Sequence, residues 1–177
     1  MIYHANFGRP LLEEGARFVG AVERVTPFND HAAKGLGAWT DYAGPKLGFV
    51  EQVYCVRPMA DAEGRTLVML KNKAGDRGAS MSWKTKSLPY FTLWKNTNAE
   101  EEGYVTGLEP GTGFPYNRRL ERKAGRVPKL KPGGSVGMAI DVSILPTREE
   151  VAGVESKIAS IQGTKPPQVD DKPDKPE

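Results

Sequence analysis

The sequence predicts an all-β domain, an antiparallel sandwich or barrel, followed by one amphipathic helix. Two observations predict the sheets. About seven short runs rich in β-branched and aromatic residues are separated by turn-forming segments. The 177 residues also include 20 glycines and 14 prolines, which suit a chain that turns often. The helix is predicted by apolar residues three and four positions apart near the C-terminus.

The strands are predicted in order along the chain. Six runs alternate or cluster apolar residues between turn signals: 17–25, 49–56, 66–71, 79–84, 90–94 and 104–108. The clearest strand covers 136–145, where every second residue is apolar: Val136, Met138, Ile140, Val142 and Ile144. The segment 29–47 has no clear period, and we expect it to cross the surface or the site.

The helix is predicted over 147–162. Thr147 and Glu150 have the spacing of a capping box, and the apolar residues that follow fall on one helical face. After it come four prolines, seven charged residues and one aliphatic residue, Val169. Such a segment has little to bury. We therefore expect residues 1–162 to form the domain and 163–177 to be a disordered tail.

Charge, cysteine content and hydropathy narrow the class of protein. A net charge of +3 is too small to indicate a nucleic-acid or membrane partner by itself. The single cysteine, Cys55, cannot close an intramolecular disulfide. No stretch reaches the roughly 20 apolar residues of a membrane helix, and residues 1–10 lack the regions of a signal peptide. We expect a cytoplasmic protein.

The most informative stretch is Gly-Leu-Glu-Pro-Gly-Thr-Gly-Phe-Pro-Tyr-Asn-Arg-Arg at 107–119. A strand is predicted to end at Leu108, which places Glu109 at the rim of a sheet. A carboxylate held there by a stiff backbone suits a general base. The alternative is a surface ion pair between Glu109 and Arg118 or Arg119.

A second stretch, Tyr-His-Ala-Asn-Phe-Gly at 3–8, supplies a histidine that can exchange protons near neutral pH. Asn6 supplies donors and acceptors for hydroxyl groups. The alternative is that His4 is structural or solvated, as a lone histidine near a terminus often is. His31, in the irregular segment, has no predicted role.

A basic run at 118–131 holds seven Lys or Arg residues and one acidic residue, Glu121. We interpret it as a solvated loop and not as a nucleic-acid site, because no aromatic residues are interleaved for base stacking. Other aromatic residues suit either the core or stacking on a sugar: Trp83, Tyr90, Phe91 and Trp94.

These segments resemble the aldose 1-epimerases, the galactose mutarotase-like superfamily, and more narrowly a distinct branch for which "LEPGTGFPYNRR" and "YHANFG" are typical. The segment 83–94 is similar to the strand, loop and strand that precede the family's glutamate. Two positions depart from the family pattern: Tyr3 replaces an Asn before the histidine, and Pro110-Gly111 replaces Thr-Gln after the glutamate.

The resemblance implies a galactose mutarotase-like β-sandwich and interconversion of sugar anomers by acid and base catalysis. Glu109 would take the proton of the anomeric hydroxyl, and His4 would protonate the ring oxygen. Asn6, Glu51 and Arg118 would bind the sugar, with Glu51 as the nearest match for the family's substrate-binding Asp and Arg118 able to reach a phosphate on it. No metal or cofactor is implied. The alternative is a sugar-binding or regulatory module without catalysis.

The resemblance also concerns length, because the family's sandwiches are much longer than this chain. The chain corresponds to the C-terminal half of such a sandwich. Half a sandwich leaves a long sheet edge and an apolar face uncovered. We therefore expect the chain either to self-associate or to require the missing N-terminal half.

Overall fold

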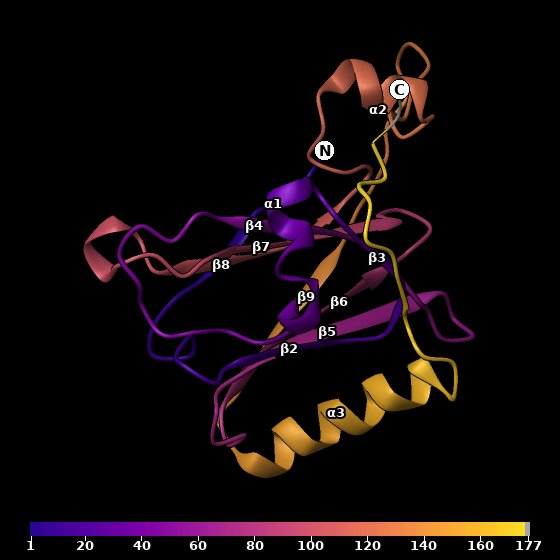
Figure 1. Cartoon of the computed structure of the whole chain (residues 1–177). Coiled ribbons are helices and arrows are strands. Elements are labelled where there is room, and N and C mark those ends of the chain that lie inside the picture. Colours follow the sequence, from indigo (N-terminus) through magenta and orange to yellow (C-terminus); the bar gives the residue numbers. More distant parts are fainter. Residues whose placement is uncertain (176–177) are drawn as a thin grey trace.

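Two β-sheets lie face to face, and one long helix, α3 (Arg148–Gln162), covers the outer side of one of them (Figure 1). The computed structural model describes residues 1–175 of the chain. The predicted class, a sandwich of mainly antiparallel strands with one C-terminal helix, is confirmed.

The larger sheet has six strands in the order β1-β8-β7-β4-β3-β10. All neighbours are antiparallel except β10 and β3. The strands are β1 (Ala5–Phe7), β3 (Val22–Pro27), β4 (Gln52–Pro58), β7 (Tyr90–Asn96), β8 (Val105–Gly111) and β10 (Gln168–Val169). The short strand β1 was not predicted.

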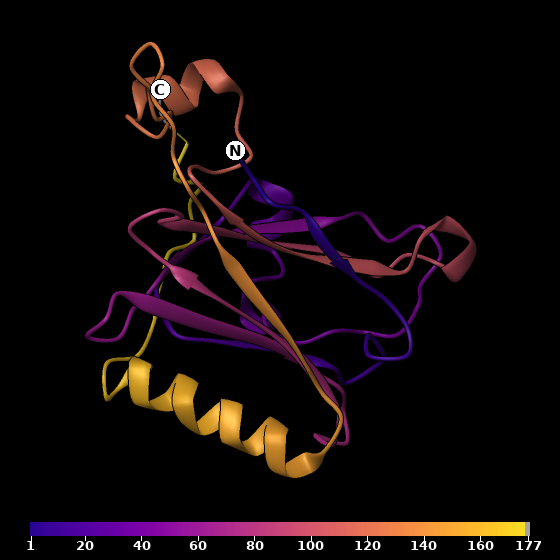
Figure 2. The same cartoon turned by 180° about the vertical axis from the view of Figure 1, so that it is seen from behind.

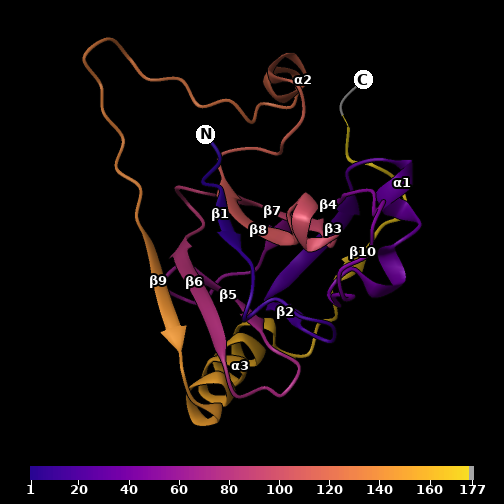
Figure 3. The same ribbon diagram turned by 90° about the vertical axis from the view of Figure 1, so that its left-hand side faces the viewer.

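The smaller sheet has four strands in the order β2-β5-β6-β9 and is seen from behind in Figure 2. Its strands are β2 (Arg17–Gly20), β5 (Arg65–Lys71), β6 (Gly78–Lys84) and β9 (Ile140–Leu145). The strand predicted over 136–145 therefore begins only at Ile140. Residues 124–139 run from α2 (Arg118–Lys123) to β9 as an extended loop (Figure 3).

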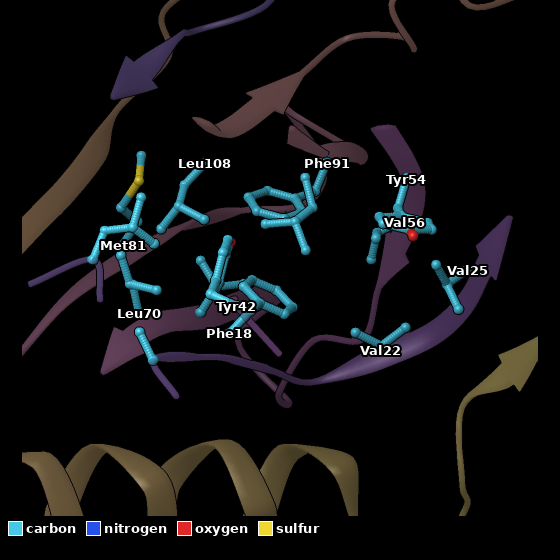
Figure 4. Packing of buried hydrophobic residues seen from close by; sticks show 14 of the residues in the cluster. Phe18, Val22, Val25, Tyr42, Tyr54, Val56, Leu70, Met81, Phe91 and Leu108 are labelled. Carbon is cyan, nitrogen blue, oxygen red and sulfur yellow. The ribbon is translucent and has the colours of Figure 1, made fainter. Parts of the chain in front are cut away.

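The core fills the space between the sheets (Figure 4). At its centre the ring of Phe91 stacks on Phe18, with centroids 5.4 Å apart, and on Trp83, with centroids 5.7 Å apart. Burying a large apolar side chain contributes about 1.5–3 kcal/mol, so this cluster is the main source of stability. Trp83 on β6 and Phe91 on β7 are thus core residues. Tyr90 and Trp94 alternate with Phe91 along β7 and so point to the outer face of the six-stranded sheet.

One charged side chain, Lys95 on β7, is buried at the core side. Its Nζ donates to the carbonyl oxygens of Ala38 at 3.0 Å and Asp41 at 2.6 Å, and it lies 5.0 Å from the centre of the Tyr42 ring. Burial lowers the pKa of Lys95 to about 8. These bonds hold the irregular segment 29–47 against the core between the sheets. No residue of this segment lines the candidate cleft described below.

The long helix begins and packs as its sequence indicates. Thr147 accepts a hydrogen bond from the backbone N of Glu150, and the backbone N of Thr147 donates to the Glu150 carboxylate at 3.1 Å. Val151 and Ile158 are buried against the outer face of the smaller sheet. Among residues 1–175, no helix has both the length and the apolar composition to span a membrane.

The expectation of a disordered tail is wrong for residues 163–175. Gln168–Val169 forms β10, which pairs with the free edge of β3 (Figure 3). Asp170 forms an ion pair with Arg24, and Asp174 lies 3.4 Å from the guanidinium of Arg57. The tail has little apolar surface to bury, but strand pairing and opposite charges hold it in place. Residues 176 and 177 lie outside the described residues.

Candidate functional site

The outer face of the six-stranded sheet carries the candidate catalytic pair. Side chains alternate along β8, so Leu108 points into the core and Glu109 points outward. The β1–β8 register pairs Asn6 with Gly107, which places His4 beside Glu109. Nε2 of His4 lies 3.0 Å from Oε1 of Glu109. Residues more than a hundred positions apart thus meet because their strands are neighbours.

Glu109 lies within β8 and not at its end, since the strand continues to Gly111. Only 4% of the residue is exposed. Burial raises the pKa of the Glu109 carboxyl to about 7, against the lowering effect of nearby His4 and with a smaller raising effect from Glu51. The carboxyl is therefore poised to gain or lose a proton near neutral pH. Its partner is His4, so the alternative of a surface ion pair with Arg118 or Arg119 is not what the structure shows.

Two polar atoms at the floor of this site have no aligned hydrogen bond. Within residues 1–175, Oε1 of Glu109 and Oγ1 of Thr92 are both buried and lack such a partner. The two residues face each other across β7 and β8. Neighbouring Gly107 leaves room for the carboxylate, because a side chain there would overlap Oε1 of Glu109. Most buried polar side-chain atoms in proteins have a hydrogen-bond partner, so these two oxygens are available to a bound ligand.

The orientation of His4 is set by Asn6. Nδ1 of His4 lies 2.8 Å from Oδ1 of Asn6. An amide oxygen only accepts, so Nδ1 carries a hydrogen and donates it. Nε2 then faces Glu109 either as a bare acceptor or, in the imidazolium, as a second donor. Nε2 of His4 and Oε1 of Glu109 are therefore close, at 3.0 Å, but they are not aligned for a hydrogen bond with each other.

A cleft of about 450 Å³ surrounds the pair. Such a volume falls within the usual range for a small-molecule site. Its lining combines apolar and aromatic side chains with two carboxylates, a histidine and a threonine: Ile2, His4, Phe28, Glu51, Val53, Thr92, Trp94, Glu109 and Pro115.

Glu51 and Trp94 form one wall of the cleft. The indole Nε1 of Trp94 donates to Oε2 of Glu51 at 2.6 Å, which fixes the second carboxylate toward the cleft. The Trp94 ring also meets the His4 ring edge-on, with centroids 5.5 Å apart. The sequence predicts Trp94 only as a core residue or as a residue that stacks on a sugar, and it predicts no role for Thr92. Their place in the site follows from the β4–β7–β8 register, which local patterns do not reveal.

Arg118 does not line this cleft. It lies in α2 and borders a neighbouring cavity, also about 450 Å³. The two cavities share Ile2 and Pro115 in their linings. The sequence suggests five residues for the site. Three of them, His4, Glu51 and Glu109, line the cleft. Asn6 contacts His4, and Arg118 lines the neighbouring cavity.

The basic run at 118–131 is not wholly solvated. Arg126 is buried and bonds both oxygens of Glu121, with its Nε at 2.8 Å and its Nη2 at 2.7 Å. Glu121 also accepts from the backbone N of Phe114 at 2.9 Å. The ring of Phe114 packs against Tyr90 on the outer face of the sheet. This ion pair therefore holds the 113–126 segment in place beside the cleft.

The arrangement supports proton transfer. A buried carboxyl with a pKa of about 7 and an adjacent imidazole can take and give protons to the hydroxyl groups of a bound ligand. No group of three or more His, Cys, Asp or Glu side chains in the described part of the chain is placed to hold a metal ion.

Comparisons with known proteins agree with this fold. A family model described as Domain of unknown function (DUF4432) matches residues 1–144. The crystal structure of a candidate aldose 1-epimerase from Klebsiella pneumoniae matches with a TM-score of 0.97 and 46% sequence identity. The match covers 99% of this chain and 46% of that one, so the chain spans about half the length of this relative. A search of curated proteins found no match.

Proposed function

The chain belongs to the DUF4432 family, and we propose that its cleft binds an aldose and interconverts the two anomers of that sugar by acid and base catalysis. The observation that carries the proposal is the 3.0 Å contact between His4 and Glu109, in a cleft of ligand size. The similar Klebsiella pneumoniae structure, a candidate aldose 1-epimerase, supports the choice of reaction.

Interconversion requires that the sugar ring open and close again. Glu109, as carboxylate, takes the proton of the hydroxyl on the anomeric carbon, and His4, as imidazolium, gives a proton to the ring oxygen. The bond between that carbon and the ring oxygen breaks, and an open-chain aldehyde forms. Rotation of the aldehyde and the reverse proton transfers close the ring as the other anomer.

The geometry suits this division of roles. The anomeric hydroxyl and the ring oxygen are bonded to the same carbon, so two groups that lie side by side can reach both. Each proton transfer to or from a well-placed side chain contributes about 10²–10⁴ in rate. A carboxyl whose pKa is about 7 is half ionised at neutral pH, where both the base and its conjugate acid are abundant.

The remaining cleft residues would hold the sugar. Glu51, fixed by Trp94, accepts hydrogen bonds from sugar hydroxyls, and the buried hydroxyl of Thr92 offers one more polar contact. The Trp94 ring offers an apolar surface to one side of the sugar. Arg118 would meet a phosphate only on a ligand that reaches from the cleft into the neighbouring cavity.

The test is the variant Glu109→Gln, which keeps size and polarity but cannot take a proton. We expect the rate of catalysed anomer exchange to fall by about 10²–10⁴ while sugar affinity changes little. Polarimetry or NMR exchange on a freshly dissolved aldose measures the rate, and calorimetry measures the affinity. Glu101→Gln, an exposed residue in η2 (Glu100–Glu102), is the matched control and should leave both unchanged.

Two outcomes would contradict the proposal. Full exchange activity in Glu109→Gln would remove Glu109 as the base. A parent protein that binds the sugar without accelerating exchange, and loses affinity in Glu109→Gln, would indicate a binding module in place of an enzyme.

A further inference from the structure

Three buried side-chain oxygens on the outer face of the six-stranded sheet lie in one row without hydrogen-bond partners. The row crosses four adjacent strands and consists of Thr26 on β3, Cys55 on β4, Thr92 on β7 and Glu109 on β8 (Figure 3). Within residues 1–175, Oγ1 of Thr26, Oγ1 of Thr92 and Oε1 of Glu109 are buried and lack an aligned partner. Thr92 and Glu109 line the candidate cleft, whereas Thr26 does not. A ligand in the cleft can therefore reach two of the three oxygens.

The hydroxyl group of Thr92 bonds neither of its neighbours in the row. On one side lies Cys55, whose thiol is bonded to the hydroxyl of Tyr116. On the other side lies Glu109, but its carboxylate does not accept from Thr92. A buried hydroxyl without a partner costs folding free energy, because it has lost its hydrogen bonds with water. The hydroxyl of Thr92 therefore destabilises the protein when no ligand is bound.

One oxygen atom of a ligand can bond both Thr92 and Glu109. Side chains directly opposite each other on antiparallel strands have Cβ atoms about 4.5–5.5 Å apart. Two hydrogen bonds of about 2.7 Å that meet at one oxygen span up to about 5.4 Å. A ligand hydroxyl suits this position, because it can accept from the Thr92 hydroxyl and donate to the Glu109 carboxylate. The two residues thus form a site for one hydroxyl group at the floor of the cleft.

We propose that Thr92 is a catalytic residue, which donates a hydrogen bond to the same anomeric oxygen from which Glu109 takes the proton. This inference rests on the proposed function. As the proton passes to Glu109, negative charge develops on that oxygen. The bond between the anomeric carbon and the ring oxygen breaks, the C=O bond of the aldehyde forms, and the ring oxygen takes a proton from the imidazolium of His4. The Thr92 donor stabilises the negative charge as it develops, as the donors of an oxyanion hole do.

The test is Thr92→Val, which keeps the shape of the side chain and removes its hydroxyl. We expect kcat for anomer exchange to fall by about 10², whereas sugar affinity should change little. Thr92→Ser keeps the donor and should retain most of the rate. NMR exchange on freshly dissolved D-glucose and D-galactose measures the rate, and calorimetry with the same sugars measures the affinity.

Stability separates this role from a structural one. The Thr92 hydroxyl is buried without a partner, so Thr92→Val should raise Tm by about 2–4 °C while it lowers the rate. Thr26→Val is the matched control, because Thr26 has the same unpartnered hydroxyl in the same row outside the cleft. It should raise Tm similarly and leave exchange unchanged. The pH at which the rate rises should stay near 7 in Thr92→Val, because Glu109 still acts as the base.

The outcomes distinguish this inference from the proposed function. If the parent protein accelerates exchange of neither sugar, the proposed function fails, and the role of Thr92 fails with it. If the parent catalyses exchange and Thr92→Val is equally fast, only the role of Thr92 is overturned. That role is also overturned if Thr92→Val lowers Tm together with the rate, if Thr92→Ser does not retain the rate, or if Thr26→Val loses as much rate as Thr92→Val.

Discussion

At the scale of single residues, the geometry of the site depends on the contacts among three neighbours, Asn6, His4 and Glu109. Asn6 fixes Nδ1 of His4, which leaves Nε2 to face Glu109. The sequence suggested Asn6 as a sugar ligand, but its amide oxygen is already used by His4. We therefore interpret Asn6 as a positioning residue that sets the orientation of the histidine.

The raised pKa of Glu109 predicts the pH dependence of the proposed reaction. Only the carboxylate accepts a proton, so the exchange rate should rise as pH increases through about 7. The negative charge of Glu51 also raises the pKa of Glu109. Glu51→Gln removes this charge while keeping an acceptor for the indole N–H of Trp94. The rising limb should then move to lower pH in this variant.

The measurement is the pH profile of catalysed anomer exchange, recorded for the parent, for Glu51→Gln and for the exposed control Glu101→Gln. The control should reproduce the parent profile. A profile that is flat between pH 5 and pH 9 would mean that Glu109 does not act as the base.

At the scale of elements, the C-terminal tail acts as an edge strand. Its aspartates face arginines of the six-stranded sheet: Asp170 pairs with Arg24, and hydrogen bonds from Gln168 and Arg24 lower the pKa of Asp170. Strand β10 occupies the edge of β3 that would otherwise be free. The tail therefore protects this edge of the six-stranded sheet.

Deleting residues 164–177 should reduce the free energy of unfolding by about 1–2 kcal/mol, because a short strand pairing and partly exposed ion pairs are lost. For a chain of this size that corresponds to a decrease in Tm of about 2–8 °C. Thermal denaturation followed by circular dichroism measures it.

Two point variants separate the specific ion pair with Arg24 from the general effect of negative charge in the tail. Asp170→Asn removes the partner of Arg24 and should lower Tm slightly, whereas the exposed Asp171→Asn should not. A deletion variant that melts with the parent would show that the tail does not stabilise the fold.

At the scale of the whole molecule, the core and the candidate site lie on opposite faces of the six-stranded sheet. The inner face of the six-stranded sheet packs against the smaller sheet, while the outer face carries His4, Glu109 and the cleft. The buried carboxyl on the outer face is a cost to folding, because its folded-state pKa of about 7 lies above the ordinary value of 4.5. Protonated Glu109 is thus favoured in the folded state.

This cost predicts how stability changes with pH. Protonated Glu109 is favoured in the folded state, and the stability that this preference contributes is complete below pH 4.5. That stability is lost as pH rises through about 7, where the buried carboxyl ionises. At pH 8, Glu109→Gln should therefore be more stable than the parent, by about 1–2 kcal/mol once solvent screening is allowed for. The difference in the free energy of unfolding between Glu109→Gln and the parent should shrink toward pH 4.5, and chemical denaturation at several pH values measures it. If this difference in the free energy of unfolding were the same at every pH, burial of Glu109 would not be the cause of its raised pKa.

Local sequence patterns determined most of the elements of this protein. Alternating apolar residues identified the long strands, and the Thr147 and Glu150 spacing identified the start of α3, because these depend on residues only a few positions apart. The two segments around His4 and Glu109 were also recognisable as motifs. Short strands such as β1 and β10 were missed, because they are too brief for a period and form only against a neighbour.

Only the tertiary structure decided which of these residues meet. The register between β1 and β8 brings His4 to Glu109, and the packing of α2 places Arg118 in another cavity. The ordered tail likewise depends on arginines more than a hundred residues away. Strand order, register and distant charge pairs are non-local, so the free energies that determine them arise only when the whole chain is folded.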